Sequence, residues 1–197
     1  IHEPAAWGSR GFPGSSILEG GQDRISRRAS AQLSAQIPGR ERTGSKEWGT
    51  DMKIERMTAE DVPKVARLEQ LVFSEPWSEN SLEESRRRPE YLFLVAREND
   101  AVVGYAGMYQ VQEEGNITNV AVAPDFWKQG IGNTLVKTLI CEAAKRHIRE
   151  MTLEVRVSNR AAIRLYERNG FVSEGCRKNY YDKPKEDALI MWNRAIQ

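Results

Sequence analysis

The chain has 197 residues, 40% of them hydrophobic and 29% charged, which is enough for one ordinary domain with a hydrophobic core but not for two large ones. Its 29 basic and 28 acidic side chains leave a formal net charge of +1, which excludes a global electrostatic field that would attract nucleic acid or an anionic membrane. Two cysteines are too few for a disulfide scaffold, so we predict reduced thiols, and we expect no metal.

No segment of the sequence has the length of a membrane helix. The longest apolar run covers residues 91–96, far short of the roughly 20 apolar residues that a membrane helix requires. The first residues also lack the apolar core of about 7–15 residues that a signal peptide needs. We therefore expect a soluble cytoplasmic protein with no membrane partner.

The composition changes near residue 51. Residues 1–51 contain 8 of the 15 glycines, 3 of the 8 prolines and 7 serines, but no Val, Tyr or Met. Such a segment buries too little apolar surface to offset the entropy of ordering, so we predict a disordered leader over residues 1–51 and a single domain over residues 52–197. By this interpretation Met52 is the natural start, and the leader is a tag, a fusion remnant or an upstream extension. A natural flexible tail is the alternative.

The first elements of the domain follow from hydrophobic periodicity. We predict a strand over residues 53–57, followed by a helix that begins at Thr58 with a capping box to Asp61. A second short helix begins at the cap Ser78 and continues to about Arg88. The apolar face of the first helix carries Val62, Val65, Ala66, Leu68, Leu71 and Val72.

Three strands are predicted next. Residues 91–97 and 101–111 are rich in strand-forming residues, and Asn99-Asp100 between them is typical of a hairpin turn. A further strand covers residues 117–123 and ends at Pro124. These strands are predicted to be the middle of a sheet.

A strand, a glycine turn and a long helix follow one another around residues 124–133. Gly130 and Gly132 can adopt backbone angles closed to other residues, and the free N–H groups at the start of the helix point to any anion above them. A pyrophosphate is the natural ligand, and a tight turn into a packed helix is the alternative. The spacing excludes a Walker loop and a full dinucleotide-binding fingerprint. We also expect Cys141, near the apolar face of the helix, to be a small core residue.

The last part of the chain alternates strands and one helix. Residues 151–157 place Leu153 and Val155 on one face of a strand, and Glu154 and Arg156 on the other, away from the main apolar layer. A helix is predicted from Asn159 to about Arg168, with Gly170 as its C-cap, and further strands begin at Phe171 and cover residues 187–192.

This succession resembles the GNAT superfamily of acetyl-CoA-dependent N-acetyltransferases over residues 53–193. The general part of the resemblance is the glycine loop, the strand with a central Glu, and the pattern Asn-x-x-Ala-x-x-x-Tyr-x-x-x-Gly-Phe from Asn159 to Phe171. More specific segments are similar to the RimI-type branch, which acetylates the N-terminal alanine of a small-subunit ribosomal protein. These segments cover residues 75–79, 119–122, 153–159, 179–181 and 186–191.

The resemblance implies an α/β (α+β) fold, in which helices flank a central mixed, mostly antiparallel sheet. It implies acetyl-CoA as the acetyl donor, a ribosomal protein N-terminus as the acceptor, Glu154 as the base and Tyr166 as the acid. Neither a metal nor a specific nucleic acid is expected. The residues it implies for cofactor binding are Val120, Ala121, Val122, Lys128, Gln129, Gly130, Ile131, Gly132, Asn133 and Asn159.

The sequence departs from the superfamily pattern at Trp127, where the glycine loop usually begins with Gln or Arg. We expect the phosphate site to survive this departure, because main-chain donors at residues 129–133 would do most of the binding. Cofactor affinity is the property in doubt.

Each proposed role has a structural alternative. Glu154 could form an ordinary ion pair with Arg156, and Tyr166 could be a core aromatic beside Ile163 and Leu165. Asn159 is also a good helix cap in its own right. Tyr180-Tyr181 could pack at a strand edge or shape a peptide cleft.

Two other functions remain open for the sequence. The first is a GNAT enzyme that acetylates lysine or a small amine, because such enzymes share the cofactor half and the resemblance places acceptor specificity in loops such as residues 74–78 and 177–183. The second is a module that binds acetyl-CoA without turnover. The basic groups at residues 86–88 and 177–178 are typical of solvated surface, although a ribosomal substrate makes RNA contact conceivable.

Overall fold

The computed structural model describes residues 52–197, so the predicted leader lies outside the described residues. Within this range no helix is long and apolar enough to cross a membrane. The strands are β1 Met52–Arg56, β2 Tyr91–Glu98, β3 Ala101–Val111, β4 Glu114–Val122, β5 Glu150–Arg156, β6 Val172–Asp182 and β7 Lys185–Asn193. The helices are α2 Val62–Val72, α3 Glu79–Arg86, α4 Ile131–Lys145 and α5 Arg160–Glu167, with 3₁₀ turns at Ala59–Asp61 and Pro124–Phe126.

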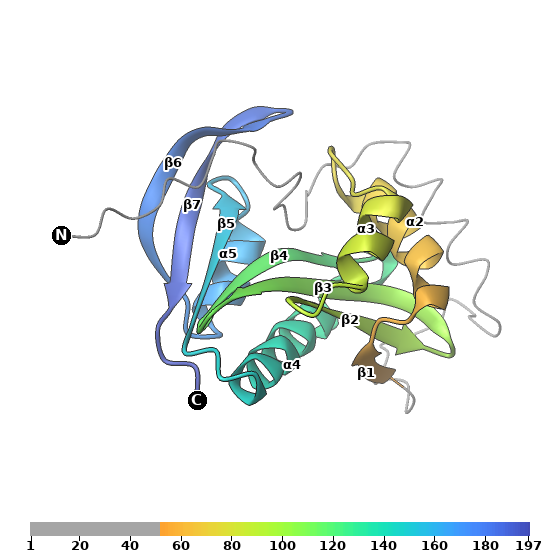
Figure 1. Ribbon diagram of the computed structural model, residues 1–197. Helices are drawn as coiled ribbons and strands as arrows, with labels where there is room; N and C mark the ends of the chain where they lie inside the picture. Colours follow the sequence, from red (N-terminus) through yellow and green to blue (C-terminus); the bar gives the residue numbers. More distant parts are fainter. Residues whose placement is uncertain (1–51) are drawn as a thin grey trace.

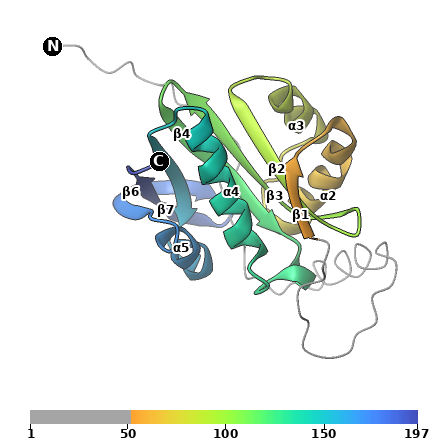
Figure 2. The ribbon, with the colours of Figure 1, turned by 90° about the horizontal axis from the view of Figure 1, so that it is seen from below.

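The strands form one seven-stranded sheet in the order β1-β2-β3-β4-β5-β7-β6. Neighbouring strands are antiparallel except β4 and β5, which are parallel. The predicted mixed, mostly antiparallel sheet flanked by helices is therefore confirmed. Helices α2 and α3 lie on one face of the β2–β4 region, and α4 lies on the other (Figure 1, Figure 2).

Local signals explain why the elements begin and end where they do. Asp61 accepts hydrogen bonds from the backbone N–H and the hydroxyl of Thr58, both at 2.9 Å, just before α2 begins. Ser78 accepts a 3.1 Å hydrogen bond from the N–H of Ser81 and so caps α3. Asn99 and Asp100 have φ of 48° and 65°, the left-handed values of a tight hairpin turn.

Some details differ from the sequence prediction. Strand β4 begins at Glu114, three residues earlier than predicted, because its first residues pair with β5 as well as β3. Cys141 is exposed, not part of the core, since it lies two residues beyond the buried Leu139, on the opposite side of α4. The buried positions of α4 are Ile131, Leu135, Val136, Leu139 and Ala143.

The other face of β5 was also predicted wrongly. Alternation placed Arg156 on a half-exposed face, but only 3% of Arg156 is exposed. The hairpin formed by β6 and β7 covers this face, and the Tyr181 ring lies 4.1 Å from the Arg156 guanidinium. Both faces of β5 are therefore covered.

Candidate active site

The sheet opens between β4 and β5. These strands pair only from Glu114–Glu150 to Asn116–Thr152, after which β5 continues with β7 and β4 with β3. Figure 1 shows the two strands running apart beyond this point. Val120, Ala121 and Val122 therefore lie where β4 has no strand partner on the β5 side, which leaves backbone groups available to an extended ligand.

The glycine loop ends at the start of α4, next to this opening. Gly130 has φ of 80°, a left-handed value, and acts as the N-cap of α4. The N–H groups of Ile131, Gly132 and Asn133 occupy the first turn, where an α-helix offers no internal acceptor. Together with the helix dipole these groups favour an anion at this position, which is the role that the glycine spacing predicts.

A cavity of about 1120 Å³ connects the loop with α5. Seven of the ten residues predicted to bind the cofactor line it: Val122, Lys128, Gly130, Ile131, Gly132, Asn133 and Asn159. Val120, Ala121 and Gln129 are not among its lining residues, and neither are Glu154 and Tyr166. Such a volume is at the upper end of ligand pockets and suits an extended molecule.

Asn159 has two roles at the rim of this cavity. Its Oδ1 accepts a 3.1 Å hydrogen bond from the N–H of Ala162 and so caps α5. Its Nδ2 is buried and has no hydrogen-bond partner among the described residues. Because an unpaired buried donor costs free energy, this atom is suited to a ligand acceptor, and the helix-cap alternative accounts for only one end of the side chain.

Tyr166 lies on the buried side of α5. Its side chain is completely buried, and its ring contacts Phe171 edge to face at 5.6 Å. Its hydroxyl has no hydrogen-bond partner within residues 52–197. Burial holds the pKa of this phenol well above its usual value, so the hydroxyl keeps its proton at neutral pH. The ring of Tyr166 therefore packs in the core, and its hydroxyl has no acceptor among the described residues.

Glu154 lies on β5, within the part of the strand that has separated from β4. Its side chain is 12% exposed, and its Oε1 lies 3.3 Å from the guanidinium of Arg177 on β6. Arg156, the alternative ion-pair partner predicted for Glu154, has an ion pair with Glu186 at 3.1 Å. Glu154 is thus a mostly buried carboxylate with an ion-pair partner on β6.

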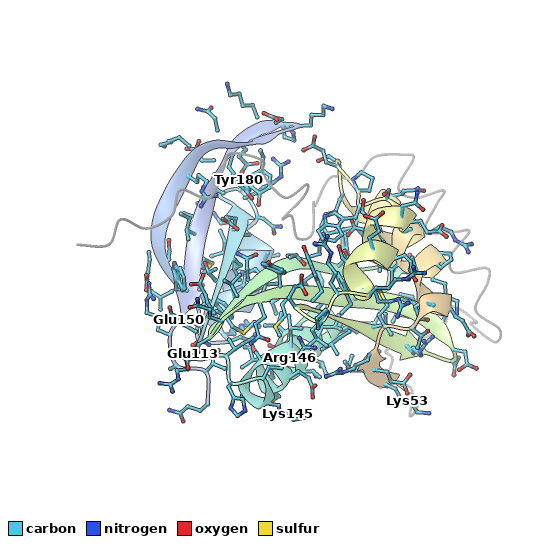
Figure 3. All side chains as sticks on the ribbon, viewed as in Figure 1. Lys53, Glu113, Lys145, Arg146, Glu150 and Tyr180 are labelled. Atoms are coloured by element: carbon cyan, nitrogen blue, oxygen red, sulfur yellow. The ribbon has the colours of Figure 1, made fainter. Side chains whose placement is uncertain are left out.

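The β6–β7 hairpin contributes aromatic groups on the acceptor side. Figure 3 shows Tyr180 near the top of this hairpin. Burial and the nearby charge of Glu154 raise the pKa of Tyr180 to about 12. The neighbouring Tyr181 is buried, and its hydroxyl donates a 3.4 Å hydrogen bond to the Glu154 carbonyl oxygen. Both tyrosines therefore lie near Glu154, Tyr181 through a hydrogen bond to its backbone and Tyr180 through the charge of its carboxylate.

The two segments predicted to select the acceptor meet at one hydrogen bond. The hydroxyl of Ser74, in the connection from α2 to α3, donates to the carbonyl oxygen of Lys183 at 2.8 Å. The guanidinium of Arg156 contacts the same turn between β6 and β7, since it donates hydrogen bonds to the carbonyl oxygens of Lys183 and Pro184 at 2.8 and 3.0 Å. This hydrogen bond joins residues that are 109 positions apart in the sequence.

Sequence reasoning missed several residues of the site. Arg156 was assigned to the face of β5 away from the main apolar layer, yet it is buried and donates hydrogen bonds to the hairpin turn. Arg160, Arg164 and Arg168 also line the cavity, and their spacing of four residues on one helix was the signal that could have identified them.

The geometry fits acetyl-CoA. The amides at the start of α4 suit a pyrophosphate, the open edge of β4 suits a pantetheine arm, and the Asn159 Nδ2 and Tyr166 hydroxyl are buried donors without partners. A site with these groups can bind an anionic thioester and supply a proton beside it.

Comparison with known proteins agrees with this geometry. The model of the acetyltransferase (GNAT) family matches residues 62–171. The [ribosomal protein bS18]-alanine N-acetyltransferase of Escherichia coli (strain K12) is 38% identical over 140 residues, covering 70% of this chain and 94% of that protein.

Solved structures give the same result. The crystal structure of the ribosomal-protein-S18-alanine N-acetyltransferase from Escherichia coli matches with a TM-score of 0.69 and 35% identity, covering 75% of this chain and 96% of that one. Ard1 from Thermoplasma volcanium matches with a TM-score of 0.68 and 26% identity over 74% of this chain and 99% of its own.

Proposed function

Because this chain belongs to the acetyltransferase (GNAT) family and is an acetyl-CoA-dependent N-acetyltransferase, we propose that it acetylates the N-terminal alanine of a small-subunit ribosomal protein, bS18 in the named relatives. The observation that carries the proposal is the match to these relatives over nearly their whole length, which includes both the cofactor side and the acceptor side of the site. A ribosomal acceptor implies that the reaction takes place in the cytoplasm.

The chemistry of the acceptor agrees with a glutamate base. An α-amino group with a pKa near 8 is roughly one-tenth neutral at pH 7, whereas a lysine near 10.4 is neutral in about one molecule in 2,500. Glu154 therefore has to remove a proton, directly or through a water molecule, from an amine whose pKa is only about one unit above pH 7. This favours an N-terminal amine over an unperturbed lysine.

Glu154 and Tyr166 divide the two proton transfers. As the amine nitrogen forms its bond to the acetyl carbon, the carboxylate of Glu154 accepts the proton that the nitrogen loses. As the carbon–sulfur bond breaks, the hydroxyl of Tyr166 donates its proton to the departing thiolate, whose pKa is near the ~8.5 of cysteine. The unpaired, protonated state of the Tyr166 hydroxyl supports this role.

Cofactor binding is assigned to the loop, to β4 and to Asn159. The first amides of α4 and the side chain of Lys128 bind the pyrophosphate, residues 120–122 offer backbone groups to the pantetheine arm, and the Asn159 Nδ2 donates to the ligand. Coenzyme A supplies an activated acetyl thioester when bound. The protein's own groups position it and handle the protons.

A panel of acceptors tests the proposal. The full chain is incubated with acetyl-CoA and one of three acceptors: an alanine-starting peptide of the ribosomal protein that contains a lysine, the same peptide with a blocked N-terminus, and a free polyamine. Acetylation of the unblocked peptide alone supports the proposal. Transfer to the blocked peptide or the polyamine assigns a lysine or small-amine acceptor, and transfer to none of them indicates a binding module.

A further inference from the structure

The cavity carries a large excess of positive charge in a chain that is nearly neutral. Its lining includes the basic residues Lys128, Arg156, Arg160, Arg164 and Arg168 but a single acidic residue, Glu186. Arg156 and Glu186 form an ion pair with each other at 3.1 Å. Four basic groups therefore remain, and none of them has an ion pair with a carboxylate of residues 52–197.

Three of these four charges lie along one side of α5. Arg160, Arg164 and Arg168 are spaced four residues apart, which places successive side chains on the same face of a helix. All three are exposed, whereas Ala162, Ile163 and Tyr166 form the buried side. The arginines therefore do not serve the packing of α5, and their guanidinium groups are available to a ligand in the cavity.

We propose that Arg160, Arg164 and Arg168 form a second phosphate site, separate from the amides of α4, that recognises the phosphate on the ribose of coenzyme A. This inference rests on acetyl-CoA as the donor. The pyrophosphate of that molecule can be satisfied by the start of α4 and Lys128, but its ribose phosphate carries a further ~1.5–2 negative charges at pH 7. A guanidinium group is always charged and can donate two parallel hydrogen bonds to the oxygens of one phosphate. A row of arginines is therefore suited to bind the negatively charged ribose phosphate.

The experiment compares two ligands that differ only in that phosphate. Calorimetry measures the dissociation constants of coenzyme A and dephospho-coenzyme A for the wild-type chain, for Arg164→Ala, for Arg168→Ala and for the variant in which all three arginines are alanine. The control is Lys137→Ala, which removes one exposed positive charge from α4 outside the cavity lining. Because the replaced side chains are exposed, the variants are expected to fold, and circular dichroism checks this.

The wild-type chain should bind coenzyme A at least 10-fold more tightly than dephospho-coenzyme A. Each single arginine variant should lose about 3- to 10-fold in affinity for coenzyme A and little for dephospho-coenzyme A, as expected for one charge-assisted contact. In the triple variant the preference should fall below about 2-fold, and in Lys137→Ala it should persist. The difference between ligands isolates the interaction, as in a double-mutant cycle.

Several outcomes would overturn the inference. Equal wild-type affinity for both ligands would do so, and so would a preference that survives in the triple variant. If the triple variant keeps the preference but loses affinity for a ribosomal RNA fragment, the arginines contact RNA instead. These measurements need no acceptor, so their failure is distinct from failure of the proposed alanine acetylation, which the wild-type peptide assay reports.

Discussion

The indole N–H of Trp127 donates a 2.7 Å hydrogen bond to the carbonyl oxygen of Val122, the last residue of β4. Trp127 occupies the position where the superfamily usually has Gln or Arg, and its half-buried ring packs against the core and lines the cavity. The Trp127 side chain therefore connects the glycine loop before α4 to β4, the strand that we assign to the pantetheine arm. This geometry gives the substitution a structural role that does not need a side-chain contact with phosphate.

Trp127→Phe is expected to weaken acetyl-CoA binding by about 3- to 10-fold, because it keeps an aromatic ring but removes one hydrogen bond worth roughly 0.5–1.5 kcal/mol. Calorimetric titration with acetyl-CoA measures this change. Trp192→Phe is the matched control, since Trp192 lies on β7 under Arg194 and outside the cavity lining. An unchanged dissociation constant in Trp127→Phe would show that the hydrogen bond from Trp127 to Val122 does not support cofactor binding.

Glu154→Gln is expected to lower turnover on the alanine peptide by about 10²–10⁴-fold, because the amide cannot accept the amine proton. The dissociation constant for acetyl-CoA should stay unchanged, since Glu154 does not line the cavity. Steady-state kinetics and calorimetry measure the two quantities. Glu150→Gln, four residues earlier on β5, serves as the control and should keep wild-type turnover. Normal turnover in Glu154→Gln would remove the assigned base.

Tyr166→Phe separates a catalytic hydroxyl from a structural ring. The Tyr166 hydroxyl is buried without a partner, so its removal should raise the free energy of unfolding by about 1 kcal/mol. Turnover should nevertheless fall by about 10²–10⁴-fold, because no proton donor remains for the thiolate. Urea denaturation and peptide kinetics test both parts, with Tyr109→Phe as the control. A fully active Tyr166→Phe enzyme would show that Tyr166 is a core aromatic residue and not the proton donor.

Much of this architecture was visible in the sequence because it depends on local patterns. The caps at Thr58 and Ser78, the turn at Asn99-Asp100 and the glycine turn at Gly130 each act within a few residues. Helix and strand periods then assign most of the remaining elements. No local pattern predicted the order of the strands or the opening between β4 and β5, because both depend on pairing between distant segments.

What could not be predicted depends on contacts between distant segments. Arg156 was placed on a half-exposed face because alternation describes one strand and says nothing of the β6–β7 hairpin that covers it. The arginines of α5 were visible as a spaced set, but the cavity that gives them a role forms only when α5 meets the loop before α4. Glu69 was overlooked because a single acidic residue within the apolar pattern of α2 gives no sign that it is buried.

Glu69 is completely buried between α2 and the sheet. Its Oε1 accepts hydrogen bonds from the Tyr105 hydroxyl and, at 3.2 Å, from the Asn119 Nδ2. Its Oε2 accepts a 2.7 Å hydrogen bond from the N–H of Trp77, in the connection between α2 and α3. Burial outweighs these bonds and raises the pKa of Glu69 from 4.5 to about 7.

The raised pKa of Glu69 predicts how stability changes with pH. Below about pH 4.5 the carboxyl is protonated in both the folded and the unfolded chain, so it adds no pH dependence. Between pH 4.5 and about 7 the folded chain holds the proton that the unfolded chain releases, and the free energy of unfolding falls as the pH rises. The loss is complete above pH 7 and is on the order of 3 kcal/mol.

Glu69→Gln removes this titration, so the stability of the wild-type chain relative to the variant should decline by most of that amount from pH 5 to pH 8. Urea denaturation at several pH values measures the difference. Asp61→Asn is the control: hydrogen bonds from Thr58 and Arg97 lower the pKa of Asp61 against its burial, so its contribution is lost only in acid and stays constant in this window. A constant separation between wild type and Glu69→Gln from pH 5 to pH 8 would show that Glu69 is ionised in the folded chain throughout.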